Sequence, residues 1–279
     1  MRECVCYLKK TLCPNYMSLE ILRDKKIREL EVNDLVHLTP FESFIEVFLP
    51  VPWLVTSLLL FPDRWYLAVI FSFFFFLAGL RVVHGAFHNS LGLSKSLDHI
   101  VMVILSAIML SSMHSVKVNH LLHHKHCMNE KDIEGKPAQM SALQAIFYGP
   151  IFFLSLHYNG WALSTKSNRY WILTDWAAIV CLILFALKEP YQNLTYHYLA
   201  MSVGQCLTAF FAVWTVHHDC EKSWFIARTI RNKIKSFITM GMFYHIEHHL
   251  YPKVPTKKLP AAAERLDKIA PELSKKKVF

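Results

Sequence analysis

The chain has 279 residues, 53% of them apolar, and its mean hydropathy of +0.27 is higher than that of a typical soluble globular protein. Only 18% of the residues are charged, and 20 Phe stand against 8 Gly, which excludes disordered, collagen-like and low-complexity chains. The net charge of +9 does not indicate a nucleic-acid partner, because the basic residues alternate with long apolar runs instead of forming one stripe. The composition therefore predicts a membrane protein.

The first segment, residues 1–43, is polar and mixed in charge, and we expect it to precede a membrane domain at residues 44–279. It lacks the basic head and short apolar run of a cleaved signal peptide. Cys4, Cys6 and Cys13 within it could carry acyl chains. The seven cysteines of the chain are odd in number and scattered, so we expect reduced thiols instead of a disulfide framework.

Six apolar stretches follow, and crossing a hydrocarbon core of about 30 Å takes roughly 20 helical residues. The stretches at 100–113 and 145–156 are short, and we expect them to lie in the interface or to dip in and return. The other four are predicted to be transmembrane helices, at residues 44–61, 65–83, 171–187 and 198–216. The prediction is an all-α membrane protein with four transmembrane helices and a histidine-rich cap made of residues 84–169 and 217–279.

Basic residues are distributed unequally about these predicted helices. Of the 30 Lys and Arg, only Arg64 and Lys188 fall in the loops that join the paired transmembrane helices, and the other 28 lie on the opposite side. Because positive residues are retained on the cytosolic side, we expect both termini and the cap to be cytosolic.

Three histidine clusters lie on this predicted cytosolic side. Histidines at i, i+3 or i+4 share one face of a helix, which is a spacing suited to metal ligands. The clusters are His84 and His88; His120, His123 and His124; and His245, His248 and His249. A further adjacent pair, His217 and His218, ends the fourth predicted transmembrane helix. The remaining histidines are interpreted as solvated or hydrogen-bonded polar groups: His37, His99, His114, His126, His157 and His197.

The number of imidazoles indicates the kind of metal site. A catalytic zinc uses three protein ligands and a water molecule, so eight or nine imidazoles suit two metal ions. Glu247 stands one place too late for the His-Glu-x-x-His zinc pattern, and the Glu-x-x-His pairs of helical-bundle di-iron proteins are absent. An all-imidazole site for two irons remains, and iron activates O2 for attack on unactivated C–H bonds.

The three clusters, with the last continuing into Leu250-Tyr251-Pro252, resemble the histidine boxes of the membrane fatty acid desaturase superfamily, which also contains carotenoid ketolases. The resemblance covers residues 40–270. It implies a cytosolic site with two Fe²⁺ ions, O2 as a substrate, and electrons from an external donor such as a ferredoxin or a b-type cytochrome. It also implies that the eight clustered histidines are ligands and that either His217 or His218 completes the set.

Acidic residues near the boxes are candidates for orienting the histidine ligands, because a ligating imidazole usually donates its other N–H group to such a partner. We expect this role for Asp219, Glu221 and Glu247, with Asp219 favoured. For Asp132 and Glu134, which follow the second box, a solvated surface position is an equal alternative.

These features together predict an oxygen-dependent di-iron desaturase that introduces a double bond into the acyl chain of a membrane lipid or thioester. The alternatives are a carotenoid ketolase or a lipid hydroxylase with the same site. A metal transporter is disfavoured, because transporters place polar ligands near mid-membrane, whereas these boxes lie at helix ends. The predicted location is the bacterial inner membrane or the endoplasmic reticulum.

Overall fold

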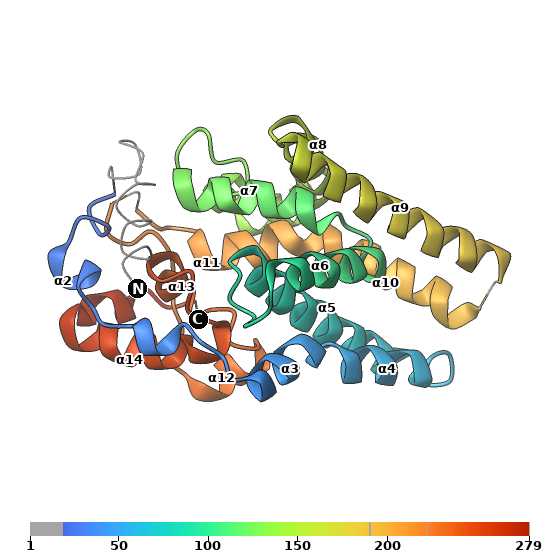
Figure 1. Cartoon of the computed structure of the whole chain (residues 1–279), viewed down its shortest axis with the longest axis horizontal. Helices are drawn as coiled ribbons and strands as arrows, with labels where there is room; N and C mark the ends of the chain where they lie inside the picture. The colour runs from blue at the N-terminus through green and yellow to red at the C-terminus, as the bar shows by residue number, and fades with distance from the viewer. Residues whose placement is uncertain (1–18, 190, 222, 279) are drawn as a thin grey trace.

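The computed structural model describes residues 19–189, 191–221 and 223–278, and within these ranges it is helical (Figure 1). The described β-structure is one isolated bridge between Thr229 and Lys277. The α-helices are α2 (Lys25–Arg28), α3 (Pro40–Phe48), α4 (Val51–Leu60), α5 (Trp65–Phe87), α6 (Lys95–Met109), α7 (Met113–His126), α8 (Ala142–Ala162), α9 (Lys166–Lys188), α10 (Gln192–Thr208), α11 (Thr215–His217), α12 (Lys233–Ile238), α13 (His245–Leu250) and α14 (Leu259–Ile269). Short 3₁₀ helices are η2 (Asn33–Leu35), η3 (Lys136–Gln139), η5 (Thr256–Lys258) and η6 (Pro271–Lys275), and η4 (Ala209–Trp214) is a π-helix.

Four helices in the described part of the chain are long and apolar enough to cross a membrane, which confirms the predicted all-α membrane fold. They span Pro40–Leu60, Trp65–Phe87, Lys166–Lys188 and Gln192–His217. The first is α3 and α4 together, with a break at Leu49 and Pro50. Each helix extends beyond the apolar run that predicts it at one end or both, and in two of them the extended end begins in polar sequence at a capping residue, Thr39 or Thr165.

Helices α6 and α7 form a bent pair whose axes change direction by 111°. Leu110 adopts a left-handed conformation with φ of 56°, and the Ser112 side chain caps α7 by accepting a hydrogen bond from the Ser115 amide. The bend allows the chain to leave the end of α5 and return to it, since Nε2 of His120 lies 3.0 Å from Nε2 of His88. This geometry supports the expectation that the stretch at 100–113 dips and returns.

Helix α8 is longer than the predicted stretch at 145–156, but it is not among the four candidate spanning helices. It packs closely against α7 and α10 through glycines. A Cβ atom added at Gly160 would lie 2.6 Å from the carbonyl oxygen of Ser115, and one added at Gly149 would lie 1.5 Å from the carbonyl oxygen of Cys206. Small residues of this kind let helix backbones approach each other in membranes.

We expect Gly149→Ala to destabilise the protein, because the added methyl group meets the α10 backbone and cannot be relieved by a rotamer change. Overpacking of this kind costs about 1–3 kcal/mol, and a backbone clash belongs at the upper end. The thermal unfolding temperature of the protein in detergent should fall by several degrees. Leu143→Ala, at an exposed position of the same helix, should leave it nearly unchanged. Equal unfolding temperatures for the two variants would contradict this packing.

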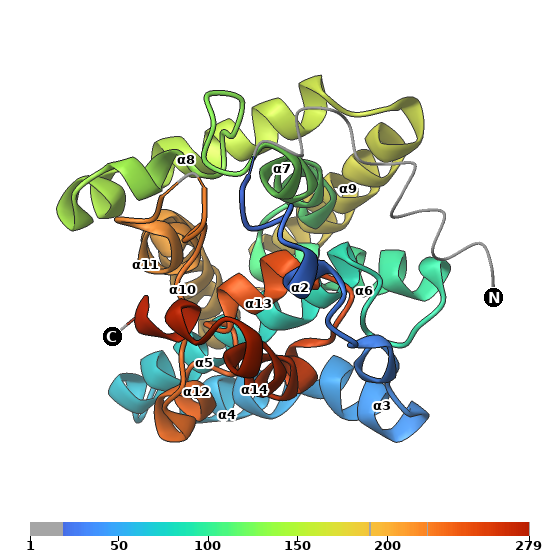
Figure 2. The same ribbon diagram turned by 90° about the vertical axis from the view of Figure 1, so that its left-hand side faces the viewer.

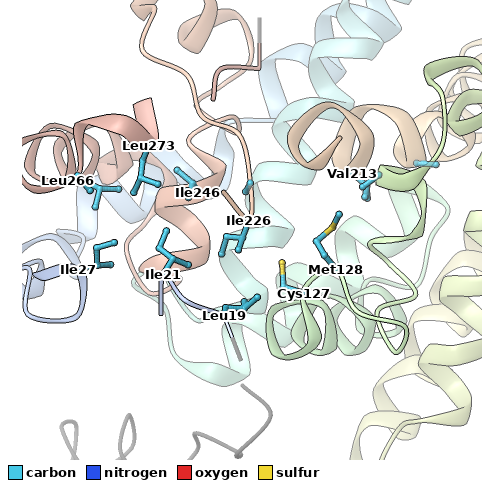
Figure 3. Packing of buried hydrophobic residues seen from close by; sticks show 14 of the residues in the cluster. Leu19, Ile21, Ile27, Cys127, Met128, Val213, Ile226, Ile246, Leu266 and Leu273 are labelled. Atoms are coloured by element: carbon cyan, nitrogen blue, oxygen red, sulfur yellow. The ribbon is translucent and has the colours of Figure 1, made fainter. Parts of the chain in front are cut away.

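The cap lies at one end of the molecule, where α2, α13 and α14 gather, and the α4–α5 and α9–α10 connections lie at the other end (Figure 1). Figure 2 views the cap end and shows α13 at its centre. A hydrophobic cluster joins the cap to α7, with Ile21 and Ile27 packed near Ile246 of α13, and Cys127 and Met128 at the end of α7 (Figure 3). This cluster holds the histidine-bearing helices α7 and α13 in a fixed relation.

Arg81 of α5 forms a second connection between the membrane helices and the cap. Its guanidinium pairs with Glu46 of α3, with Nη2 2.6 Å from Oε2, and Nη1 donates to the carbonyl oxygen of Met240 at 2.6 Å. Since Arg81 lies one turn before His84, this pairing fixes the end of α5 that carries the first box. The described cysteines are free thiols, as expected, whereas Cys4, Cys6 and Cys13 lie outside the described residues.

Candidate metal centre

Nine of the ten candidate histidines converge in the cap as two adjacent groups. In each group, one nitrogen from every member lies within 4.8 Å of the others. The first group contains His84, His88, His120, His124 and His248, and the second contains His123, His217, His245 and His249. The sequence therefore brings all three boxes together, although they are far apart along the chain.

Two short helices contribute to both groups. On α7, His120 and His124 are one turn apart and face the first group, whereas His123 faces the second. On α13, His248 belongs to the first group, and His245 and His249, again one turn apart, belong to the second. The consecutive histidines of the second and third boxes thus place one imidazole in each group.

The imidazole nitrogens approach one another closely within each group. In the first, Nε2 of His124 lies 3.1 Å from that of His120 and 2.9 Å from that of His248. In the second, Nε2 of His245 lies 2.9 Å from that of His217 and 3.2 Å from that of His249. Two ligands at about 2.1 Å from a shared metal ion and at right angles to each other are about 3.0 Å apart.

The hydrogen bonds on the outer side of the rings show why a cation fits here. Nδ1 of His217 donates to the carbonyl oxygen of Ile226 at 2.9 Å, and Nδ1 of His123 donates to Asp132 at 2.8 Å. A neutral imidazole that donates from Nδ1 has only a lone pair at Nε2. The Nε2 atoms of His123 and His217 lie 3.1 Å apart, so with both rings in this neutral form two lone pairs would face each other. A metal ion bound by both nitrogens would remove this repulsion.

Two acidic residues of the loop after α7 orient histidines of the site. Asp132 is buried and accepts hydrogen bonds from His123 and from the amides of Met128 and Gly135, each at 2.8 Å. Glu134 accepts a hydrogen bond from Nδ1 of His120 at 2.9 Å. For these two residues, the sequence alone does not distinguish this role from a solvated surface position.

The acidic residues favoured from the sequence are placed differently. The side chain of Asp219 is 79% exposed and pairs with Arg228, and Glu221 is also exposed. Glu247 is buried, but its carboxylate accepts hydrogen bonds from Arg231 and Thr229, at 2.7 Å each. In the described residues, none of these three side chains forms a hydrogen bond with a histidine of either group. Glu247 faces away because neighbouring residues on a helix point in different directions.

The structure separates the two adjacent candidates at the end of α11. His217 is buried in the second group, whereas His218 turns away, stacks on Trp214 with ring centroids 3.8 Å apart, and donates from Nδ1 to the Trp214 carbonyl at 2.7 Å. The π-helix η4 lies just before this pair. An extra residue in the turn changes which side chain faces inward, and sequence spacing gives no indication of it.

Burial determines the protonation of the third box. Removal from water, followed by the proximity of other imidazoles, lowers the pKa values of His248 and His249 well below that of a free histidine. Both rings are therefore neutral at physiological pH, which is the form that binds a metal.

The other described histidines lie outside the two groups, and four of them have side-chain hydrogen-bond partners elsewhere. Nε2 of His197 donates to the Ile108 carbonyl at 2.9 Å, and His157 accepts a hydrogen bond from the Ser112 amide at 3.0 Å. His114 bonds to Asp175 and His99, and His37 is exposed. None of them belongs to either candidate metal group.

A cavity with a mainly apolar lining adjoins both groups. Its wall includes His84 and His120 of the first group and His245 of the second. The apolar part comes from α5, α8 and the π-helix, through Leu77, Leu80, Val83, Phe87, Phe152, Phe153, Phe211 and Val213. An apolar molecule in this cavity would lie directly against the candidate metal centre.

Comparison with known proteins agrees with this site. The family model described as fatty acid desaturase matches residues 63–277, which include all three histidine boxes. No curated protein matches the chain. Such a family match supports a desaturase or a related di-iron oxygenase, and hence an oxygen-dependent oxidoreductase in a membrane. The chain belongs to the fatty acid desaturase family.

Proposed function

We propose that this protein is a desaturase that removes two hydrogens from neighbouring carbons of an acyl chain. The observation that carries the proposal is the apolar cavity whose wall includes His84, His120 and His245. An acyl chain is long, apolar and unreactive, so it needs an apolar site that places one C–C bond beside an oxidising centre.

The donor set described above fits two iron ions, which we propose are held by the nine converging histidines. Bound there, iron would supply the activation of O2 for hydrogen removal from an unactivated C–H bond. Asp132 and Glu134 fix the orientation of His123 and His120, and Phe87, with its neighbours in the cavity wall, excludes water. Forming one double bond consumes one O2, two protons and two electrons and releases two water molecules. The electrons come from an external ferredoxin or b-type cytochrome.

The decisive measurement is mass spectrometry of lipids from a host that lacks carotenoids and expresses the full chain. We expect acyl chains two mass units lighter, formed only when O2 is present. The His248→Ala variant should form none, because it loses an imidazole of the first group, whereas His37→Ala, at an exposed histidine outside both groups, should match the parent.

The same experiment distinguishes the related reactions. Acyl chains sixteen mass units heavier would identify a hydroxylase. An oxygenated ring in hosts supplied with carotenoids, with unchanged acyl chains, would identify a ketolase. Either result would replace the desaturase proposal.

We also propose that the two histidine groups and both termini face the cytosol, in the endoplasmic reticulum or the bacterial inner membrane. The support is the positive charge on the cap side, where 28 of 30 basic residues lie. An impermeant thiol reagent applied from the opposite side should label Asp63→Cys above the parent level and should not label Lys276→Cys. The reverse pattern would invert the topology.

A further inference from the structure

A groove of about 670 Å³ lies along α7 and the loop that follows it, separate from the cavity at the metal centre. None of the residues that line one of these spaces lines the other. The groove is lined by His99, His114, Lys117, Val118, Leu121, Leu122, Lys125, His126, Lys131, Leu163 and Asn168. It therefore combines basic and apolar side chains in one concave surface.

All the charged side chains that line the groove are positive. Lys117, Lys125 and Lys131 contribute three ammonium groups, and the lining contains no carboxylate. Within residues 19–278 as far as they are described, no Asp or Glu forms an ion pair with any of the three. Asp98 acts on Lys117 only through its charge. An anionic ligand would therefore meet lysines that are not already neutralised by a salt bridge.

One wall of the groove is held rigidly by a buried polar chain. Asp175 of α9 is fully buried and accepts a hydrogen bond from Nδ1 of His114 at 2.9 Å. Nε2 of His114 lies 2.8 Å from Nδ1 of His99, and His99 stacks on Trp171 with ring centroids 4.3 Å apart. In this chain the proton of His99 lies on Nδ1, so its Nε2 carries a lone pair, and the lysines are the groups of the lining that attract an anion.

The apolar rim of the groove is exposed at the surface of the molecule. Leu121 is 42% exposed and Leu163 is 56% exposed. Trp161, near the end of α8, and Tyr170, in the second turn of α9, are also exposed, and α9 is one of the four candidate spanning helices. Trp and Tyr are concentrated at the depth of lipid headgroups. From these aromatic residues we expect the basic part of the groove to lie at headgroup depth, with its apolar rim toward the acyl-chain region.

We propose that this groove binds the phosphate of an anionic phospholipid headgroup, with Lys117, Lys125 and Lys131 as its cationic partners. The acyl chains of this lipid lie against the exposed side of α9. Basic pockets between membrane helices on the cytosolic side bind anionic headgroups in this way. The site is independent of the acyl chain that undergoes reaction, because the groove and the metal-centre cavity have no lining residue in common.

The test uses the full chain in nanodiscs of phosphatidylcholine that contain a small fraction of phosphatidylglycerol. Native mass spectrometry measures how much phosphatidylglycerol stays bound to the protein when the protein is released from the nanodisc. We expect enrichment over phosphatidylcholine, a decrease in high salt, and a loss of about tenfold or more in Lys125→Gln/Lys131→Gln, since each lysine near a membrane contributes about 1 kcal/mol.

The matched control is Lys253→Gln/Lys268→Gln, which removes the same charge from two exposed lysines of the cap outside the groove. It should retain phosphatidylglycerol at the parent level, and both double variants should keep the parent iron content and unfolding temperature. Equal retention by the two double variants would overturn the proposal. A second result would also overturn it. If the protein bound soluble adenosine 3′,5′-bisphosphate through these lysines but showed no enrichment of phosphatidylglycerol, the groove would be a site for the phosphate of a soluble ligand.

Discussion

Replacing His217 by Ala is expected to abolish turnover and to lower bound iron, whereas replacing its neighbour His218 should do neither. His217 is buried, with Nε2 3.1 Å from that of His123 and 2.9 Å from that of His245, so its loss removes one of four imidazoles from the second group. His218 contacts Trp214 and lies outside both groups. Two adjacent histidines thus provide a matched pair of variants.

The measurement is iron per chain by elemental analysis, together with acyl-chain products from cells that contain equal amounts of each variant. An unfolding temperature for each purified variant shows whether a lost activity reflects a lost fold. Retention of full iron and activity by His217→Ala, with loss in His218→Ala, would reverse the assignment made from the geometry.

The second large effect is expected for Asp132→Asn. The carboxylate of Asp132 has its oxygens occupied by three donors, from His123, Met128 and Gly135. An amide in its place lacks the negative charge that favours Nδ1–H on His123, and its NH2 group must face at least one of these N–H groups. Loss of such a partner of a metal ligand typically costs 10–100-fold in metal affinity or activity, and we expect a decrease in this range.

Competition with a chelator measures the affinity, since the variant should release iron at a roughly 10–100-fold lower chelator concentration than the parent. Asp219→Asn is the control, because Asp219 is exposed and contacts Arg228 instead of a site histidine. If Asp219→Asn released iron as readily as Asp132→Asn, the carboxylate partner of the site would have to be reassigned.

The sequence alone predicted much of this molecule, because the relevant signals are local and periodic. The i, i+4 spacing of His84 and His88 places two imidazoles on one helical face, and long apolar runs indicate membrane helices wherever they occur. The sequence also predicts that the chain returns between His88 and His120, because two boxes that serve one site must lie at the same end of the membrane helices.

The remaining features depend on backbone detail and tertiary contacts. The side of the helix that carries His217 follows from the π-turn at Ala209–Trp214, which no residue spacing indicates. Asp219 and Glu247 are closer to histidines along the chain than Asp132 is, yet the loop after α7 brings Asp132 to His123, and Arg231 draws Glu247 away. Proximity in sequence is a poor guide to hydrogen-bond partners outside regular helices.

Helices α7 and α13 each contribute histidines to both groups, and this affects how two metal ions would bind. An ion bound by His120, His124 and His248 would immobilise the same two helices that carry His123, His245 and His249. The ordering that the first ion imposes is then already in place for the second, so the second ion binds with a smaller loss of conformational entropy. This shared ordering favours positive cooperativity, and the mutual repulsion of two cations opposes it. If the ordering outweighs the repulsion, a sample given half the iron it can hold should be mainly a mixture of empty and doubly occupied chains.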